Sequence, residues 1–192
     1  MSSLVLSGDT SGSITVSAPA VAGSNTQTLV AATGTLAPLI AGTAVASTSG
    51  TSIDFTGIPS WVKRITVMFD GVSLSGTDNI LVQIGPSSAV ETTSYISSST
   101  QTSGAAGGTA GSTAGFIVRC ATAANLCYGH LVITNITSNT WISSHTLSAD
   151  GSASGTFGGG SKALSSGPLA RLSITRTGTN TFDAGSINIL YE

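Results

Sequence analysis

The sequence predicts an all-β fold, an antiparallel β-sandwich of jelly-roll-like type with an extended N-terminal arm. Two observations carry this prediction. From residue 51 onward, apolar and polar residues alternate with period two in one segment after another. Clusters of Gly, Ser, Asn and Asp separate these segments at the spacing of turns, and no convincing helical window interrupts them. Both features are typical of sandwiches and jelly rolls.

Residues 1–50 form a region of their own, rich in Ser, Thr, Ala and Gly. Short β-type runs at 13–17 and 26–30 lie between Gly, Pro and Asn breakers, and none has the bulk to fold alone. We interpret residues 1–50 as an attachment arm that orders against its own domain, a sister subunit or a larger assembly. The alternative is a flexible tail. Residues 51–192 then form the β-sandwich domain.

The densest strand is predicted at 62–70, directly after Pro59 and Trp61. Alternation places Ile65, Val67 and Phe69 on one face, which we expect to anchor a core otherwise built from small residues. Further strands are predicted at 79–84, 116–120, 128–136, 140–147, 169–176 and 186–191.

Two segments rich in Gly and Ser, 97–113 and 148–167, are interpreted as long loops. Loops of more than about 12–15 residues are usually functional or mobile, so these are the places to expect contacts with a ligand. The candidate ligand contacts are Tyr95, Phe157 and Trp141, since exposed aromatic rings stack on sugars.

Charged residues make up only 7% of the chain, and the formal net charge is −2. The few Lys and Arg are scattered, which argues against nucleic-acid binding because that binding depends on clustered positive charge. Scarce surface charge favours association and fits a crowded assembly. The longest mildly apolar run, 36–46, is too short for a membrane span and contains a proline. The first residues lack the features of a secretory signal.

We find no catalytic constellation, no metal-ligand spacing and no cofactor motif. His145 and His130 stand alone on predicted strands, where a histidine is more often a packing residue than a base or a ligand. The run 158–162 resembles a phosphate loop only superficially, because its lysine follows the serine and no helix comes after it. Asp78, Asp150 and Asp183 lie in turn sequences, which Asp commonly shapes.

Cys120 and Cys127 are seven positions apart, a spacing that matches neither a zinc knuckle nor a redox pair. We favour two small structural side chains. The alternative is a disulfide that forms late in an oxidising setting and closes a short loop.

Several stretches carry a resemblance to bacteriophage virion proteins. The opening LSGDTSGSITVSAPAVAGSNTQTLVAATGTL resembles the N-terminal segment of phage tail-fibre proteins. The stretches TSIDFTGIPSWVKRITVMFDGVSLSGTDNILVQIG, TSNTWISSHTL, GGGSKALS and TFDAGSINILYE look like a β domain of the same kind of protein. Together they cover most of the chain, although each motif is compositional and carries no active site.

The resemblance implies a virion structural protein, a homotrimer that is made in the host cytoplasm without a signal peptide. Its partners would be capsid, portal or tail proteins. Because residues 1–50 run almost directly into one β domain, a short appendage or a capsid-decoration subunit fits better than a long fibre. The alternative is a receptor- or glycan-binding adhesin that uses 97–113 and 148–167 to reach a host surface glycan. A depolymerase is disfavoured, since paired carboxylates are lacking.

Overall fold

The structure of the chain is a computed structural model, which divides into two compact units, Met1–Leu36 and Ala37–Glu192. The residues that it describes are 3–7, 9–17, 20–21, 24, 26, 33–34, 36–102, 107–120, 122–123, 125–149 and 154–192. Within these ranges every regular element is a strand, and no helix is long and apolar enough to cross a membrane. The prediction of an all-β fold is confirmed.

The first unit contains a two-stranded antiparallel sheet, which we call the ribbon. It consists of β1 (Ser3–Ser7) and β2 (Ser13–Ser17), so the strand predicted at 13–17 is confirmed. The strand predicted at 26–30 lies outside the described residues, apart from Thr26.

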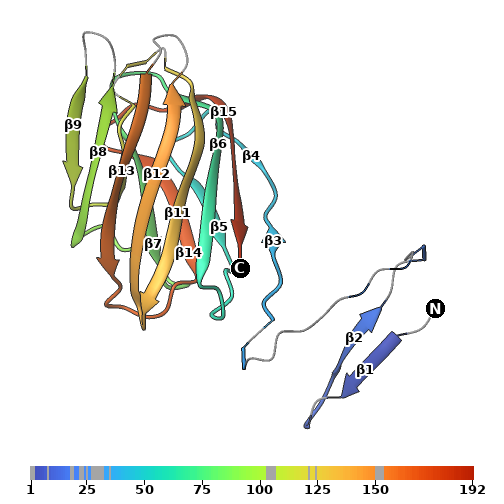
Figure 1. Cartoon of the computed structure of the whole chain (residues 1–192). Coiled ribbons are helices and arrows are strands. Elements are labelled where there is room, and N and C mark those ends of the chain that lie inside the picture. The colour runs from blue at the N-terminus through green and yellow to red at the C-terminus, as the bar shows by residue number, and fades with distance from the viewer. Residues whose placement is uncertain are drawn as a thin grey trace. The chain divides into compact units, whose positions relative to one another are not determined.

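The second unit is a sandwich of two antiparallel sheets, visible as two layers in Figure 1. The larger sheet has nine strands in the order β3-β15-β6-β11-β12-β13-β8-β9, with β4 also paired to β15. Its strands are β3 (Ile40–Ala41), β4 (Val45–Ala46), β6 (Arg64–Leu74), β8 (Tyr95–Thr102), β9 (Gly108–Ser112), β11 (Cys127–Thr137), β12 (Thr140–Ala149), β13 (Ser154–Ala163) and β15 (Phe182–Tyr191). The smaller sheet has the order β10-β7-β14-β5, with β5 (Ile53–Thr56), β7 (Ile80–Gly85), β10 (Phe116–Val118) and β14 (Arg171–Arg176).

The hydrophobic core lies between the two sheets. Ile65, Val67 and Phe69 of β6 point into it, as the alternation predicts, and Thr66 and Met68 lie on the outward face. The aliphatic side chains of β7 and β14 face them from the smaller sheet, among them Ile80, Val82, Ile84, Leu172 and Ile174. The chain crosses repeatedly from one sheet to the other, and its longer strands, apart from β9, bury one face in the same core.

The compact unit begins at Ala37, whereas the change in composition lies near residue 50. Residues 40–46 supply β3 and β4, which both pair with β15 at the edge of the larger sheet. Ser47 adds a backbone bond from its N–H to the carbonyl oxygen of Gly185 (2.9 Å). This part of the predicted arm therefore orders against the chain's own domain.

The two segments interpreted as long loops are mostly strands in the described part of the chain. Residues 97–113 contribute β8 and β9, and 148–167 contribute β13, so the interpretation as loops was wrong. Their small residues allow backbones and side chains to approach closely. A Cβ atom on Gly158 would lie 2.7 Å from Cε1 of His145, and one on Gly160 would lie 2.9 Å from Cβ of Ser97.

Cys120 and Cys127 are joined by a disulfide, and both residues are buried. Our preference for two small structural side chains over a disulfide was therefore wrong. The disulfide links the end of β10 in the smaller sheet to the start of β11 in the larger one.

Candidate functional site

The three candidate aromatic contacts lie in different environments. Tyr95 is only 1% exposed and Trp141 only 4%, so neither ring can stack on a ligand at the surface. The hydroxyl of Tyr95 accepts the backbone N–H of Ile84 (2.8 Å) and donates to the carbonyl oxygen of Glu91 (3.0 Å). Burial raises the pKa of this hydroxyl, which stays protonated. Phe157 is 49% exposed on the outward face of β13 and remains a candidate.

A cluster of buried polar side chains lies on the inward face of β8, β12 and β13. The hydroxyl oxygen of Ser99 is 2.9 Å from Nε2 of His145 and 2.9 Å from the hydroxyl oxygen of Thr156. Alternation places all three side chains on the face toward the smaller sheet, where large aliphatic residues would be expected.

The neighbouring edge of the smaller sheet explains this polarity. One side of β10 pairs with β7, and its other side faces β8. There the backbone N–H of Ile117 donates to the hydroxyl of Ser97 (2.9 Å), and the N–H of Arg119 donates to the hydroxyl of Ser99 (3.0 Å). The serine hydroxyls thus accept the backbone N–H groups that the carbonyl groups of a neighbouring strand would otherwise accept.

A serine beside a histidine invites comparison with a nucleophile and its base. Such a pair needs a third group to orient the histidine and access for a substrate. Nδ1 of His145 has no hydrogen-bond partner within the described residues, and both side chains are buried. Burial lowers the pKa of His145 to about 4, so the ring is neutral at pH 7. The pair has the geometry of a packing contact.

A second polar group is a buried ion pair at the ends of β8 and β13. Nζ of Lys162 lies 2.5 Å from Oε2 of Glu91 and donates to the carbonyl oxygen of Thr93 (2.9 Å). Burial alone would raise the pKa of Glu91, but hydrogen bonds from Lys162, Ser166 and Ser165 outweigh it and lower the pKa to about 2. Lys162 also lies over the ring of Tyr95, 5.1 Å from its centroid. The pair joins the segment before β8 to the end of β13.

Of the aspartates predicted to lie in turns, Asp78 joins two loops, whereas Asp183 lies on β15 and contacts β6, so its placement in a turn was wrong. Asp78 accepts the backbone N–H of Asn180 (2.9 Å), and Asp183 accepts the hydroxyl of Ser73. Asp150 lies outside the described residues. His130 is exposed on the outward face of β11. No group of three metal-ligating side chains occurs among the residues that the structure describes.

The ribbon carries the most unusual surface. Its register places Leu4 opposite Val16 and Leu6 opposite Ile14, so these four aliphatic side chains share one face. All four are more than half exposed. The other face carries Val5 among hydroxyl residues, including Ser7, Ser13 and Thr15.

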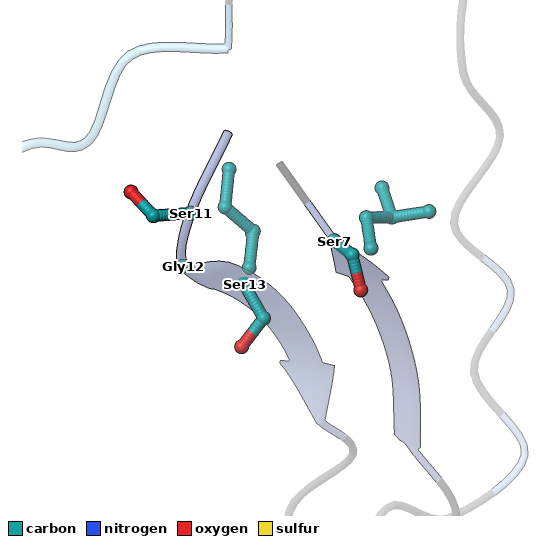
Figure 2. A pocket seen from close by; sticks show the side chains of 6 residues that line it. Ser7, Ser11, Gly12 and Ser13 are labelled. Atoms are coloured by element: carbon teal, nitrogen blue, oxygen red, sulfur yellow. The ribbon is translucent and has the colours of Figure 1, made fainter. Parts of the chain in front are cut away.

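An open hollow lies where the ribbon turns, lined by Leu6, Ser7, Ile14 and the segment 11–13. Figure 2 shows Ser11 and Gly12 on the segment that leads into β2, Ser13 at the start of β2, and Ser7 across from them on β1. The described residues that line the hollow carry no charged side chain and no polar group beyond hydroxyls and backbone, so we treat it as part of the ribbon's surface.

Comparisons with protein-family models, with curated proteins and with solved structures returned no match to this chain.

Sequence reasoning missed both the ribbon's apolar face and the buried polar cluster. The first could have been found, because LVL and ITV place aliphatic residues two apart on either side of a Gly-containing turn. The second could not, because Ser99 is 46 residues from His145 and 57 from Thr156, and no local pattern relates them.

Proposed function

We propose that this chain is a non-enzymatic structural subunit of a bacteriophage particle, either a short tail appendage or a capsid-decoration protein. In this proposal the N-terminal unit docks on another virion protein, such as a capsid, portal or tail protein, and the β-sandwich forms the body of the subunit. The resemblance of the sequence to phage fibre proteins suggests the class, and it implies a homotrimer.

The observation that carries the proposal is the amphipathic ribbon. Isolated two-stranded sheets are marginally stable in water, because they have no second layer on which to bury an apolar face. Here Leu4, Leu6, Ile14 and Val16 form such a face, and all four are largely exposed. Full burial of each side chain would contribute roughly 1.5–3 kcal/mol, enough for the four together to hold the chain on a partner.

The rest of the described chain supports a structural role. The buried side chains of Lys162 and His145 make internal contacts, Lys162 in the ion pair with Glu91 and His145 against Ser99. The polar cluster seals a sheet edge, and the disulfide joins the two sheets. These features favour a durable scaffold.

Glycan binding is the second candidate, and of the three predicted aromatic contacts Phe157 is the one that favours it. The outward positions of β8, β9, β12 and β13 carry no carboxylate, amide or guanidinium group. These are the groups that could bind neighbouring sugar hydroxyls in pairs, so we rank this function below the structural one.

The test is incorporation of the full-length chain carrying Leu6→Ser with Ile14→Ser into phage particles. We expect at least a tenfold drop in copies per capsid protein, measured by quantitative mass spectrometry of purified particles, because about 1.4 kcal/mol of lost binding already gives tenfold. The matched control is Val5→Ser with Thr15→Ser, a directly paired position on the opposite face.

Wild-type incorporation of the Leu6/Ile14 variant would refute docking through the ribbon, as would an equal loss in the control. If the wild-type chain is not found in particles, the proposed function fails. The wild-type copy number also separates the two subclasses: a number close to that of the capsid protein indicates decoration, and a few copies indicate a tail component.

A further inference from the structure

The larger sheet has an outward face whose composition differs from that of an ordinary protein surface. Along β12, β13, β8 and β9, the outward positions carry hydroxyl residues, glycines, one alanine and three large apolar side chains, and none is charged. The large side chains are Ile96 (78% exposed), Phe157 (49%) and Ile142 (42%). We call this surface the neutral face.

The strand registers arrange the neutral face in rows that run across the strands. One row contains Ser144, Gly159, Ser98 and Gly111, and every member is small. The next row on one side contains Thr146, Phe157, Thr100 and Thr109, and the row on the other side contains Ile142, Ser161 and Ile96. A row of small residues therefore lies between two rows with bulky members. The two bulky rows are four residues apart along each strand, or about 13 Å at ~3.3 Å per residue.

This arrangement is complementary to itself. A bulky row from one molecule can lie over the small-residue row of another, where Gly159 and Gly111 have no side chain to obstruct it. Such a contact needs no pairing of opposite charges, and the face has no charge that would have to lose its water. Charge depletion with exposed aromatic and aliphatic groups is also the composition of protein interface centres.

The size of the face limits the strength of the contact. Four strands spaced ~4.8 Å apart and about seven residues long give a footprint of roughly 400 Å². A stable interface buries about 800 Å² on each partner, so this face alone would support a weak, reversible contact. A contact of that strength suits a subunit that is held in place by further interactions.

We propose that the neutral face is a contact surface between copies of this chain. It is separate from docking of the ribbon on another virion protein and does not depend on it. The residues that carry the contact are Phe157, Ile96 and Ile142, with Gly159 at the centre of the small-residue row.

The experiment is analytical ultracentrifugation of the full-length chain over a wide range of concentrations. We expect the wild-type protein to associate reversibly, and the variant Ile96→Lys with Phe157→Lys to associate at least tenfold more weakly. Both side chains are exposed, so lysine can be accommodated without disturbing the core, and circular dichroism checks that the fold is retained. The charges would have to be buried unpaired in the contact.

The control is Leu39→Lys, which places one lysine on another exposed aliphatic residue of the compact unit, next to β3 at the far edge of the sheet. It should associate like the wild type. A dimer or a trimer is consistent with the proposal, provided that charging the neutral face dissociates it.

Three results would overturn the proposal. They are a wild-type chain that stays monomeric at the highest concentration, an oligomer that is unaffected by the two lysines, and an oligomer that Leu39→Lys weakens equally. The Leu6→Ser and Ile14→Ser variant distinguishes the two proposals. If it dissociates the oligomer and the face variant does not, the copies associate through the ribbon.

Discussion

The two halves of the nine-stranded sheet bury their inward faces in different ways. On β6, β11 and β15 the inward side chains are large and aliphatic or aromatic, including Phe69, Leu131 and Ile189. On β8, β12 and β13 the inward positions include Ser99, His145 and Thr156, together with glycines.

The difference follows from what each half faces. The first half packs against the inward faces of β7 and β14, whose backbone groups are already paired, so only apolar contact is needed. The second half lies beside the edge of β10 that pairs with no described strand, and the N–H groups there need acceptors from side chains. Hydroxyl side chains are required there, because a buried donor without a partner is costly. The core is therefore polar where the larger sheet meets the edge strand β10 of the smaller sheet, and apolar where it meets the inward faces of β7 and β14.

The largest expected effect is loss of bulk from the aliphatic half. Phe69→Ala removes a ring that is almost fully buried, and we expect the free energy of unfolding to fall by about 3–5 kcal/mol. Urea denaturation measures it. Met68→Ala on the outward face of the same strand is the control and should cost about 1 kcal/mol or less. Equal losses in the two variants would contradict the assignment of faces.

Acid should destabilise the polar half through His145. Its pKa is about 4 in the folded chain against 6.5 when exposed, so the folded state resists protonation. The stabilisation is full above pH 6.5 and is lost as the pH falls through 4, by up to about 3 kcal/mol. The lowered pKa of Glu91 gives a second loss of stability at lower pH, as the pH falls from 4.5 to about 2.

The measurement is the free energy of unfolding between pH 7 and 4. His145→Gln should flatten its dependence on pH, whereas the control His130→Gln should retain the loss seen in the wild type. If His145→Gln leaves the pH dependence unchanged, the buried cluster is not the acid-sensitive element.

The smallest of the three effects should come from the hydroxyl that seals β10. Ser99→Ala leaves the N–H of Arg119 without its acceptor, and we expect a loss of about 1–3 kcal/mol. Ser98→Ala, on the exposed face of the same strand, should change stability by less than about 0.5 kcal/mol. Hydrogen exchange at Arg119 gives a second measurement, and it should accelerate only in Ser99→Ala. No acceleration would show that the edge is protected in another way.

The strands that could be predicted were those with bulky alternation. In the segment 62–70, alternation correctly predicted that Ile65, Val67 and Phe69 share the buried face. The segments 79–84 and 186–191 were also correctly predicted as strands. The segments of β8, β9 and β13 were interpreted as loops because they are rich in Ser and Gly, which are not typical strand residues. Their length was a warning, since loops of almost twenty residues are uncommon inside a compact domain.

The candidate aromatic contacts also show what a local sequence pattern cannot predict. Tyr95, Trp141 and Phe157 all lie on strands with similar neighbours in sequence, yet two are buried and one is exposed. Alternation relates positions within one strand, but it does not say which face of a strand is covered. The outcome depends on where the smaller sheet lies.

The sequence by itself determined that the chain forms β-strands, where the bulky strands lie, and that charge plays little part in its surface, because propensity, period and composition are local properties. Only the tertiary structure decided that 97–102 and 154–163 are strands, that Cys120 bonds to Cys127, and that hydroxyls belong inside one half of the sandwich. These features depend on a backbone edge brought beside residues far away in the chain, and the free energy of satisfying its N–H groups exists only after the two sheets have packed.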